Sequence, residues 1–323
     1  MPRSLLVLVL CVWLPAYGSD SIDALHAAAK SGDTETIRKL VASGVDVNAI
    51  KKGDGGTPLL TATNWNNYEA VKTLIALKAS INFKVGQWTP LTRAVGRDTR
   101  IVKLLIESGA DVNYADPMFG YTPLSSAAGN RRDTFERLTK SGGYVGPFPD
   151  STETVRLLIK AGANVNHVDR SGMSPLRIAM TKNNIEIARL LLEAGADVNQ
   201  RRPAQIGTQN GDTILMETVF FYPVFKNINA VKLLLDFKAN PNDRNEVEYS
   251  EEMEPKGNGW RGYSVLGYAA KYGLNEVVDL LLKSGADPTS TRTDGKPPLQ
   301  LAKENNQQKA AALIEAALKS KAP

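Results

Sequence analysis

The side chains that could do chemistry in this chain are few and scattered. Its 323 residues include two histidines, His26 and His167, and one cysteine, Cys11. A metal centre or a nucleophilic site needs several such side chains together, and a lone histidine without a partner seldom catalyses. The sequence therefore predicts no catalytic residue, no metal and no cofactor.

The motifs that bind phosphate or activate a serine are missing from the sequence. It contains no glycine-rich phosphate loop after a strand and no nucleophile elbow. Asp-Val-Asn recurs and could suggest calcium, but its regular recurrence favours hydrogen bonding within loops. The net charge of +5 is not gathered into a run of Lys or Arg, so we expect no nucleic-acid partner.

The first 18 residues have the pattern of a secretory signal peptide. Arg3 precedes an apolar run from Leu5 to Leu14, and the small residues Ala16 and Gly18 suit a cleavage site before Ser19. We therefore expect the chain to be exported to the periplasm or secreted, and not to be inserted in the membrane after cleavage.

Two alternatives to cleavage remain open on this pattern. The apolar run could be an uncleaved anchor, although it is short for a hydrocarbon core about 30 Å thick. Cys11 could be lipidated, although Leu10 is not the small residue expected before such a cysteine. The chain after residue 18 contains no cysteine, which suits an oxidising compartment.

One phrase recurs through the rest of the chain, and its elements must position any binding residue. Thr-Pro-Leu, or a close variant, begins the first half, and an apolar helix ending in Gly-Ala-Asp-Val-Asn forms the second. The repeats start near residues 23, 57, 89, 122, 174, 213, 264 and 297. Four of the seven intervals lie close to the ~33-residue period of one repeat class.

The phrase resembles that of the ankyrin-repeat family over about residues 21–318. The resemblance implies an all-α solenoid of about eight helix-pair units with β-hairpin-like loops, in a single array over residues 19–323. It also implies a structural role for His26, which follows the phrase Asp23-Ala24-Leu25. His167 falls in a hairpin loop, where we expect a solvated side chain.

The longer intervals predict three insertions. We place them near residues 131–150, 220–228 and 243–262, the first basic, the second aromatic and the third acidic. Insertions in repeat proteins map to loops on one face, often the binding face. A mobile solvated loop is the alternative for the acidic segment, and packing between loops is the alternative for the aromatic one.

The residues themselves account for such a unit. Threonine caps the N-terminus of a helix, proline suits its first position, and glycine just past the end takes a positive φ. Lys78 and Lys238 stand where other repeats have this glycine, so we expect these helix ends in the second and sixth repeats to be strained or differently capped.

Aromatic residues before the Thr-Pro-Leu phrases and in the insertions are the candidates for partner binding, because such side chains dominate binding hot spots. Local packing is the alternative for each. The candidates are Trp65, Trp88, Tyr121, Met173, Phe220, Phe221, Tyr222, Phe225, Trp260 and Tyr263.

These observations predict a non-enzymatic module that binds another protein and is monomeric when free. Within that class we favour an inhibitor or immunity protein for a toxic effector. An envelope scaffold and a secreted effector that binds host proteins are the alternatives.

Overall fold

Each recurring Thr-Pro-Leu phrase begins a helix, as predicted. In the computed structural model, the hydroxyl oxygens of Thr57 and Thr122 accept backbone N–H groups at the starts of α3 (Pro58–Asn64) and α7 (Pro123–Ala128). Ser174, Thr213 and Ser264 cap later helices in the same way. The proline that follows loses nothing there, because the first N–H groups of a helix have no partner within it.

The structure describes residues 19–51, 56–129, 151–202, 211–244, 262–291 and 295–320. The predicted signal peptide, the insertion at 131–150, most of the insertion at 243–262 and Trp260 lie outside these ranges. The other described helices are α1 (Ser19–Ser31), α2 (Thr34–Ala42), α4 (Tyr68–Ala76), α5 (Pro90–Ala94), α6 (Thr99–Glu107), α9 (Ser151–Lys160), α10 (Pro175–Thr181), α11 (Ile185–Glu193), α12 (Ile214–Phe220), α13 (Tyr222–Phe225), α14 (Ile228–Asp236), α15 (Val265–Lys271), α16 (Asn275–Lys283), α17 (Pro298–Glu304) and α18 (Gln308–Ser320).

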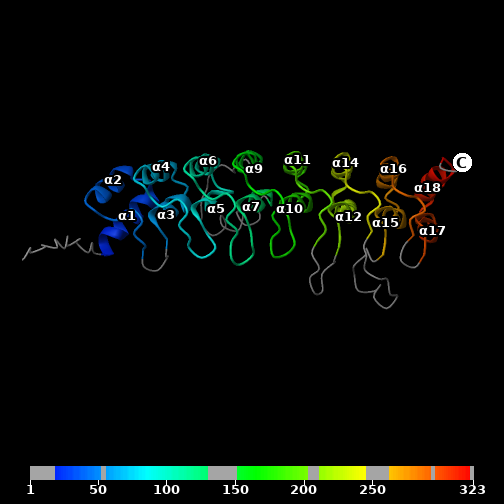
Figure 1. The fold of residues 1–323 in the computed structure, drawn as a ribbon, viewed down its shortest axis with the longest axis horizontal. Helices are drawn as coiled ribbons and strands as arrows, with labels where there is room; N and C mark the ends of the chain where they lie inside the picture. Colours follow the sequence, from blue (N-terminus) through cyan, green and yellow to red (C-terminus); the bar gives the residue numbers. More distant parts are fainter. Residues whose placement is uncertain are drawn as a thin grey trace, which may run out of the picture. The chain divides into compact units, whose positions relative to one another are not determined.

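The chain divides into two compact units, Met1–Ala94 and Val95–Pro323. In the first unit, α1 packs on α3 and α3 on α5, while α2 packs on α4. In the second unit, the first helices of successive repeats form one layer and the second helices another (Figure 1). The first layer runs α7, α10, α12, α15, α17, and the second runs α6, α9, α11, α14, α16, α18. Within the described residues, the β content is limited to isolated bridges such as Arg201–Thr213.

The second helix of each repeat buries one apolar stripe against the first. In α6, Val102 and Leu105 are fully buried, and in α9 Val155 and Leu158 take the same places. A spacing of three residues keeps both side chains on one face of a helix. The stripe therefore joins the two layers of helices.

The ends of these second helices need left-handed backbone. Gly109 and Gly195 adopt φ values of 89° and 88°, which cost glycine nothing. Lys78 and Lys238 each adopt φ of 69° at the equivalent positions. The predicted strain in the second and sixth repeats is thus confirmed, since a lysine is forced into a conformation that L-residues avoid.

The recurring asparagines link one repeat to the next. Asn166 accepts a hydrogen bond from the Asp197 N–H at 2.8 Å and donates one to the Gly195 carbonyl at 3.1 Å. Asn199 makes the same two bonds one repeat later. The prediction that Asp-Val-Asn serves loop hydrogen bonding is confirmed.

The aromatic insertion is narrower than 220–228. Three residues, 182–184, join α10 to α11, whereas residues 221–227 join α12 to α14. In both connections the residue before the N-cap is left-handed, Asn183 in one and Lys226 in the other. The added residues are therefore those of the short helix α13.

The fifth repeat is also longer than the common period, at a place where no insertion was predicted. The interval from Ser174 to Thr213 exceeds the common period because the loop after α11 is extended, and the bridge between Arg201 and Thr213 closes that loop. Residues 203–210 within it lie outside the described ranges.

Candidate protein-binding surface

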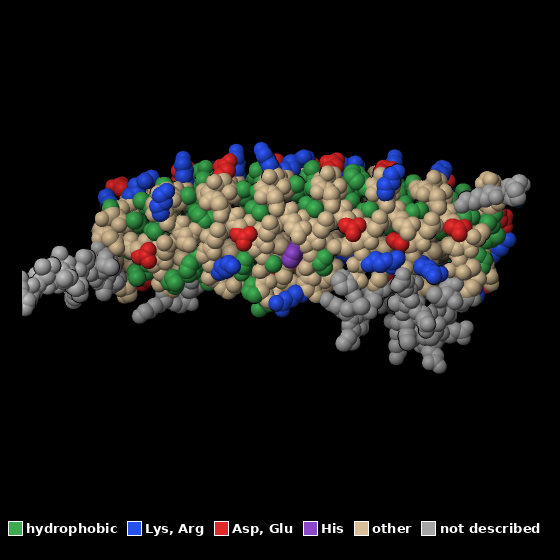
Figure 2. Space-filling model, in the orientation of Figure 1, with side chains coloured by type: hydrophobic (Ala, Val, Ile, Leu, Met, Phe, Trp, Pro, Cys, Tyr) green, Lys and Arg blue, Asp and Glu red, His purple; other side chains and the backbone are tan. Residues whose placement is uncertain are grey.

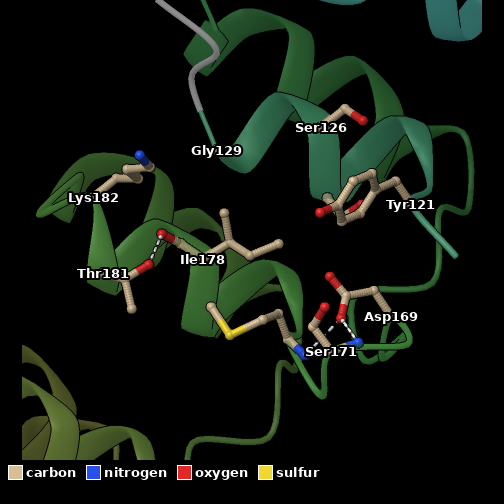
Figure 3. Close-up of a pocket in the computed structure, with 10 residues that line it drawn as sticks. Tyr121, Ser126, Gly129, Asp169, Ser171, Ile178, Thr181 and Lys182 are labelled. Atoms are coloured by element: carbon tan, nitrogen blue, oxygen red, sulfur yellow. Dashed lines mark hydrogen bonds between the residues drawn. The ribbon is translucent and has the colours of Figure 1, made fainter. Parts of the chain in front are cut away.

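A groove lies between α7 and α10 in the second unit. It encloses about 310 Å³. Tyr121 and Met173 line one end, and Gly129 and Lys182 line the other. Figure 3 shows Tyr121, at the start of α7, and Ile178, on α10, facing the same space. Ser125, Ser126, Asp169, Ser171 and Thr181 complete the lining.

The hairpins hold the two groove residues that the sequence predicted. The buried carboxylate of Asp116 accepts the backbone N–H groups of Phe119 and Tyr121 at 2.8 and 2.6 Å. Asp169, also buried, accepts that of Met173 at 2.9 Å. Backbone fixed by buried carboxylates presents side chains in a defined place, which favours binding because less freedom is lost.

The groove has an aromatic margin that sequence reasoning missed. Phe119 is 44% exposed and stacks on Tyr121 with ring centroids 5.4 Å apart, and Met118 beside it is 61% exposed. Their position in the sequence, directly before the turn at Gly120, could have identified both residues as exposed hairpin residues. Tyr121 therefore belongs to a small apolar ridge.

The predicted tryptophans lie in the first unit. Trp65 ends α3, is exposed, and carries the Lys30 ammonium 4.1 Å from its ring centroid. Trp88 is half-buried in a tight turn with the Arg93 guanidinium 3.9 Å from its ring. Such cation–π contacts hold both rings in place.

The predicted aromatic residues of the sixth repeat form a connected cluster. Phe220 lies 5.2 Å from Phe221 and 6.0 Å from Tyr268, and Phe221 lies 6.2 Å from Phe225. These residues stand at the C-terminal end of α12, whereas Tyr121 and Met173 stand at the N-terminal ends of α7 and α10. The structure thus separates the candidates into two surfaces.

Tyr263 does not present a binding surface. Its side chain is only 3% exposed, its hydroxyl accepts a hydrogen bond from the Lys271 ammonium at 3.0 Å, and its ring meets Tyr268. The placement of Tyr263 on the partner-binding face is therefore corrected: it is a packing residue, because the side chain turns into the stack.

The two histidines are structural. His26 is buried, with one ring nitrogen 2.9 Å from the Thr61 hydroxyl and the other 2.9 Å from the Ala49 carbonyl. His167 is half-buried in its hairpin, so its ring is partly exposed to solvent, and one ring nitrogen also bonds to the Gly120 carbonyl at 2.8 Å. Both join neighbouring repeats.

The fifth and sixth repeats enclose a buried ion pair. Arg177 is fully buried, and its guanidinium meets the Glu217 carboxylate at 2.7 Å. The same guanidinium donates to the carbonyls of Gln200 and Asp212 at 2.7 and 3.1 Å. The Arg177 guanidinium therefore has its partners within the fold and is not accessible to a ligand.

Exposed charges of both signs lie on the described residues. Figure 2 shows Lys and Arg as well as Asp and Glu on the face that it draws. Several pair along one helix, as Lys283 does with Asp279 at 2.7 Å. Such pairs partly cancel each other's field at the surface.

The described residues offer no obvious place for a metal ion. They bring together no group of three or more His, Cys, Asp or Glu side chains that could hold one. In the same ranges, every helix is too short or too polar to cross a membrane.

Comparison with known proteins agrees with this architecture. A profile described as ankyrin repeats in three copies matches residues 25–116, 149–202, 202–292 and 225–321, and a single ankyrin-repeat profile matches residues 119–170. The ankyrin repeat domain of Bcl-3 superposes with a TM-score of 0.60 at 24% identity, over 81% of this chain and 99% of that domain. This likeness concerns the fold alone.

Curated relatives are longer than the region matched. An ankyrin repeat protein of fowlpox virus, FPV031, is 32% identical over 184 residues, which is 54% of this chain and 47% of the viral protein. Human Rabankyrin-5 is 27% identical over 199 residues, or 52% of this chain and 17% of that protein. The matches thus span less than half of these relatives' lengths. The chain belongs to the ankyrin-repeat family, whose repeats are protein–protein interaction modules.

Proposed function

We propose that this chain is an exported, non-catalytic protein that captures one protein partner through the groove between α7 and α10. The observation that carries the proposal is the groove itself: Tyr121, Met173 and Ile178 line it, and buried carboxylates hold the hairpins beside it. Rigid aromatic and apolar side chains around a concave space are the usual anchor of a protein interface.

Capture is tested by recovering partners from the envelope fraction of the source organism with the chain lacking residues 1–18. We expect one stoichiometric partner, lost when Tyr121→Ala and Met173→Ala are combined. Tyr68→Ala, on the outer helix α4, is the matched control and should retain it. Equal recovery by all three proteins would show that the groove is not the capture site.

Export is the second part of the proposal, and it rests on the pattern of Arg3 and the apolar run from Leu5 to Leu14. N-terminal sequencing of the protein from the extracytoplasmic fraction should begin at Ser19. Leu8→Arg should retain the protein in the cytoplasm with its first residues intact. Cytoplasmic recovery of the unaltered chain would contradict export.

We further propose an inhibitor or immunity role, because the described residues suit occlusion of a partner rather than its chemical change. The activity or toxicity of the captured protein should fall when one equivalent of the chain is added. An unchanged activity would leave capture standing and reject the inhibitory role, in favour of an envelope scaffold or a secreted effector.

A further inference from the structure

The inserted helix α13 has no counterpart in the other described connections between the two helices of a repeat, and the connection of the fourth repeat lies outside the described residues. In the second repeat α3 is joined to α4 by residues 65–67, and in the sixth repeat α13 lengthens this connection. Its hydrophobic residues are not needed to close the turn, since the same turn is made elsewhere by three residues. Closing the turn therefore does not account for the presence of α13.

One contact fixes α13 on the next repeat, and a second fixes the end of the helix before it. The Tyr222 hydroxyl donates to the Glu276 carboxylate of α16 at 2.5 Å, and burial and this bond raise the pKa of Tyr222 to about 12. At the end of α12, Phe220 lies against the Tyr268 ring of α15. Both contacts are with the seventh repeat, so α13 and the end of α12 are anchored on the same neighbour.

The apolar side chains of the insertion remain exposed although the helix is fixed. Val224 is 73% exposed, Phe225 40% and Phe221 36%. Tyr272, 45% exposed, joins them through Tyr268, whose ring lies 4.5 Å away. We call Phe221, Val224, Phe225 and Tyr272 the aromatic patch. Single exposed apolar residues are ordinary, but a connected group of them on one surface marks an interaction site.

Among the described residues, Lys226, Lys271 and Glu276 are the charged side chains that the contacts place at the aromatic patch. Lys226 ends α13, and within the described residues it pairs with no carboxylate. The Lys271 ammonium lies 5.1 and 5.4 Å from the rings of Tyr263 and Tyr272. The nearby acid is Glu276, and one of its oxygens already accepts the Tyr222 hydroxyl. A ligand that covers the patch would meet the exposed ammonium group of Lys226, whereas the ammonium group of Lys271 already donates to the Tyr263 hydroxyl.

We propose that the aromatic patch is a second docking surface, which binds a segment of the partner in which apolar side chains are interspersed with acidic ones. The apolar side chains would cover Phe221, Val224 and Phe225, and an acidic side chain beside them would pair with Lys226. This inference rests on the proposed function, because it describes the chemistry of the same partner. The surface is distinct from the groove, which α7 and α10 form.

The test uses two fluorescein-labelled synthetic peptides of equal length, one with alternating Leu, Phe and Asp and the other with Lys in place of Asp. Fluorescence anisotropy measures their binding to the chain lacking residues 1–18. We expect the Asp peptide to bind about fivefold more tightly, and Lys226→Glu to abolish this preference. Equal binding of the two peptides would overturn the proposal.

The site is checked with Val224→Ser combined with Phe225→Ser. Both side chains are exposed, so the fold should persist, as circular dichroism and urea unfolding will verify, while affinity for the Asp peptide falls about tenfold. Ile50→Ser, at another exposed apolar residue, should change nothing. Undiminished binding by the double variant would refute the patch as the site.

The two proposals fail separately. The variant with Tyr121→Ala and Met173→Ala should lose partner capture yet bind the Asp peptide normally. If the unaltered chain captures no partner but binds the Asp peptide at the patch, the proposed function is wrong and the patch chemistry stands. If capture succeeds and the peptides do not bind, the patch proposal is wrong.

Discussion

Arg177 occupies, in the fifth repeat, the place that His26 holds in the first. Each follows the leucine of its phrase, and each reaches a carbonyl at the base of its own hairpin, of Gln200 in one case and Ala49 in the other. His26 then meets the Thr61 hydroxyl, whereas Arg177 meets Glu217 at the equivalent position of the next repeat. The fifth repeat thus has an ion pair where the first has a hydrogen bond between a histidine and a threonine.

This substitution predicts strong coupling between the two sites. Glu217→Thr alone should lower the free energy of unfolding by about 3 kcal/mol, because it leaves a buried guanidinium without its counter-charge. Adding Arg177→His should restore most of the loss by recreating the pair of the first repeat. Urea unfolding of both single variants and the double variant measures this, and additive effects would contradict it.

The left-handed lysines give a second prediction at the scale of single residues. Lys238→Gly should stabilise the chain by about 0.5–1 kcal/mol, because relief of the Cβ strain exceeds the extra entropy of a glycine in the unfolded chain. Lys232→Gly, in the middle of α14, should destabilise it by about 1 kcal/mol. Thermal unfolding distinguishes the two, and destabilisation by both would show that position 238 is unstrained.

Among the elements, α13 depends on one hydroxyl. Because the folded pKa of Tyr222 exceeds its unfolded value, the contribution of this tyrosine to stability is complete below about pH 10 and is lost as pH rises through about 12. Tyr222→Phe should remove this alkaline loss. Urea unfolding at several alkaline pH values compares the two proteins, and identical pH profiles would exclude the effect.

The sequence allowed the helices of each repeat to be predicted but not α13. The motif Thr57-Pro58-Leu59 and its copies supply an N-cap, a first helical turn and an apolar residue together. The helices of each repeat can therefore be predicted from local sequence. Four residues around Pro223 carry no helical period, and their anchor, Glu276, lies in another repeat. Other contacts between repeats could not be predicted either, because their partners also lie far apart in the sequence.

The sequence predicted two of the side chains that line the groove, but not the groove itself. The place of Tyr121 and Met173 before their phrases marked them as hairpin residues, and the structure puts both at one groove. The sequence could not show that Tyr263, at the same position of a later repeat, is buried, because its burial depends on Tyr268 and Lys271. Equivalent positions share a backbone but not their neighbours.

At the scale of the second unit, stability depends on links between neighbours. Asn113, Asn166, Asn199 and Asn242 each bond to the repeat that follows. In a repeat protein each unit contacts only its neighbours, so the weakest interface sets how cooperatively the stack unfolds. The asparagines distribute a similar link along the unit.

Asn199→Ala should therefore act on cooperativity as well as stability. We expect a loss of about 1 kcal/mol, together with a broader urea transition, because the fifth and sixth repeats become less coupled. Hydrogen exchange at the Asn240 amide should accelerate. Asn229→Ala, on the exposed face of α14, is the control. A parallel shift with an unchanged slope would contradict the interpretation.

The ion pair between Arg177 and Glu217 also constrains how such a gene can change. The asparagine links use the same two bonds at each junction that they join, so exchanging repeats would preserve them. A crossover between the fifth and sixth repeats would instead bury an arginine without its glutamate, or leave the glutamate without its arginine. We therefore expect these two repeats to be kept together when the array is shuffled.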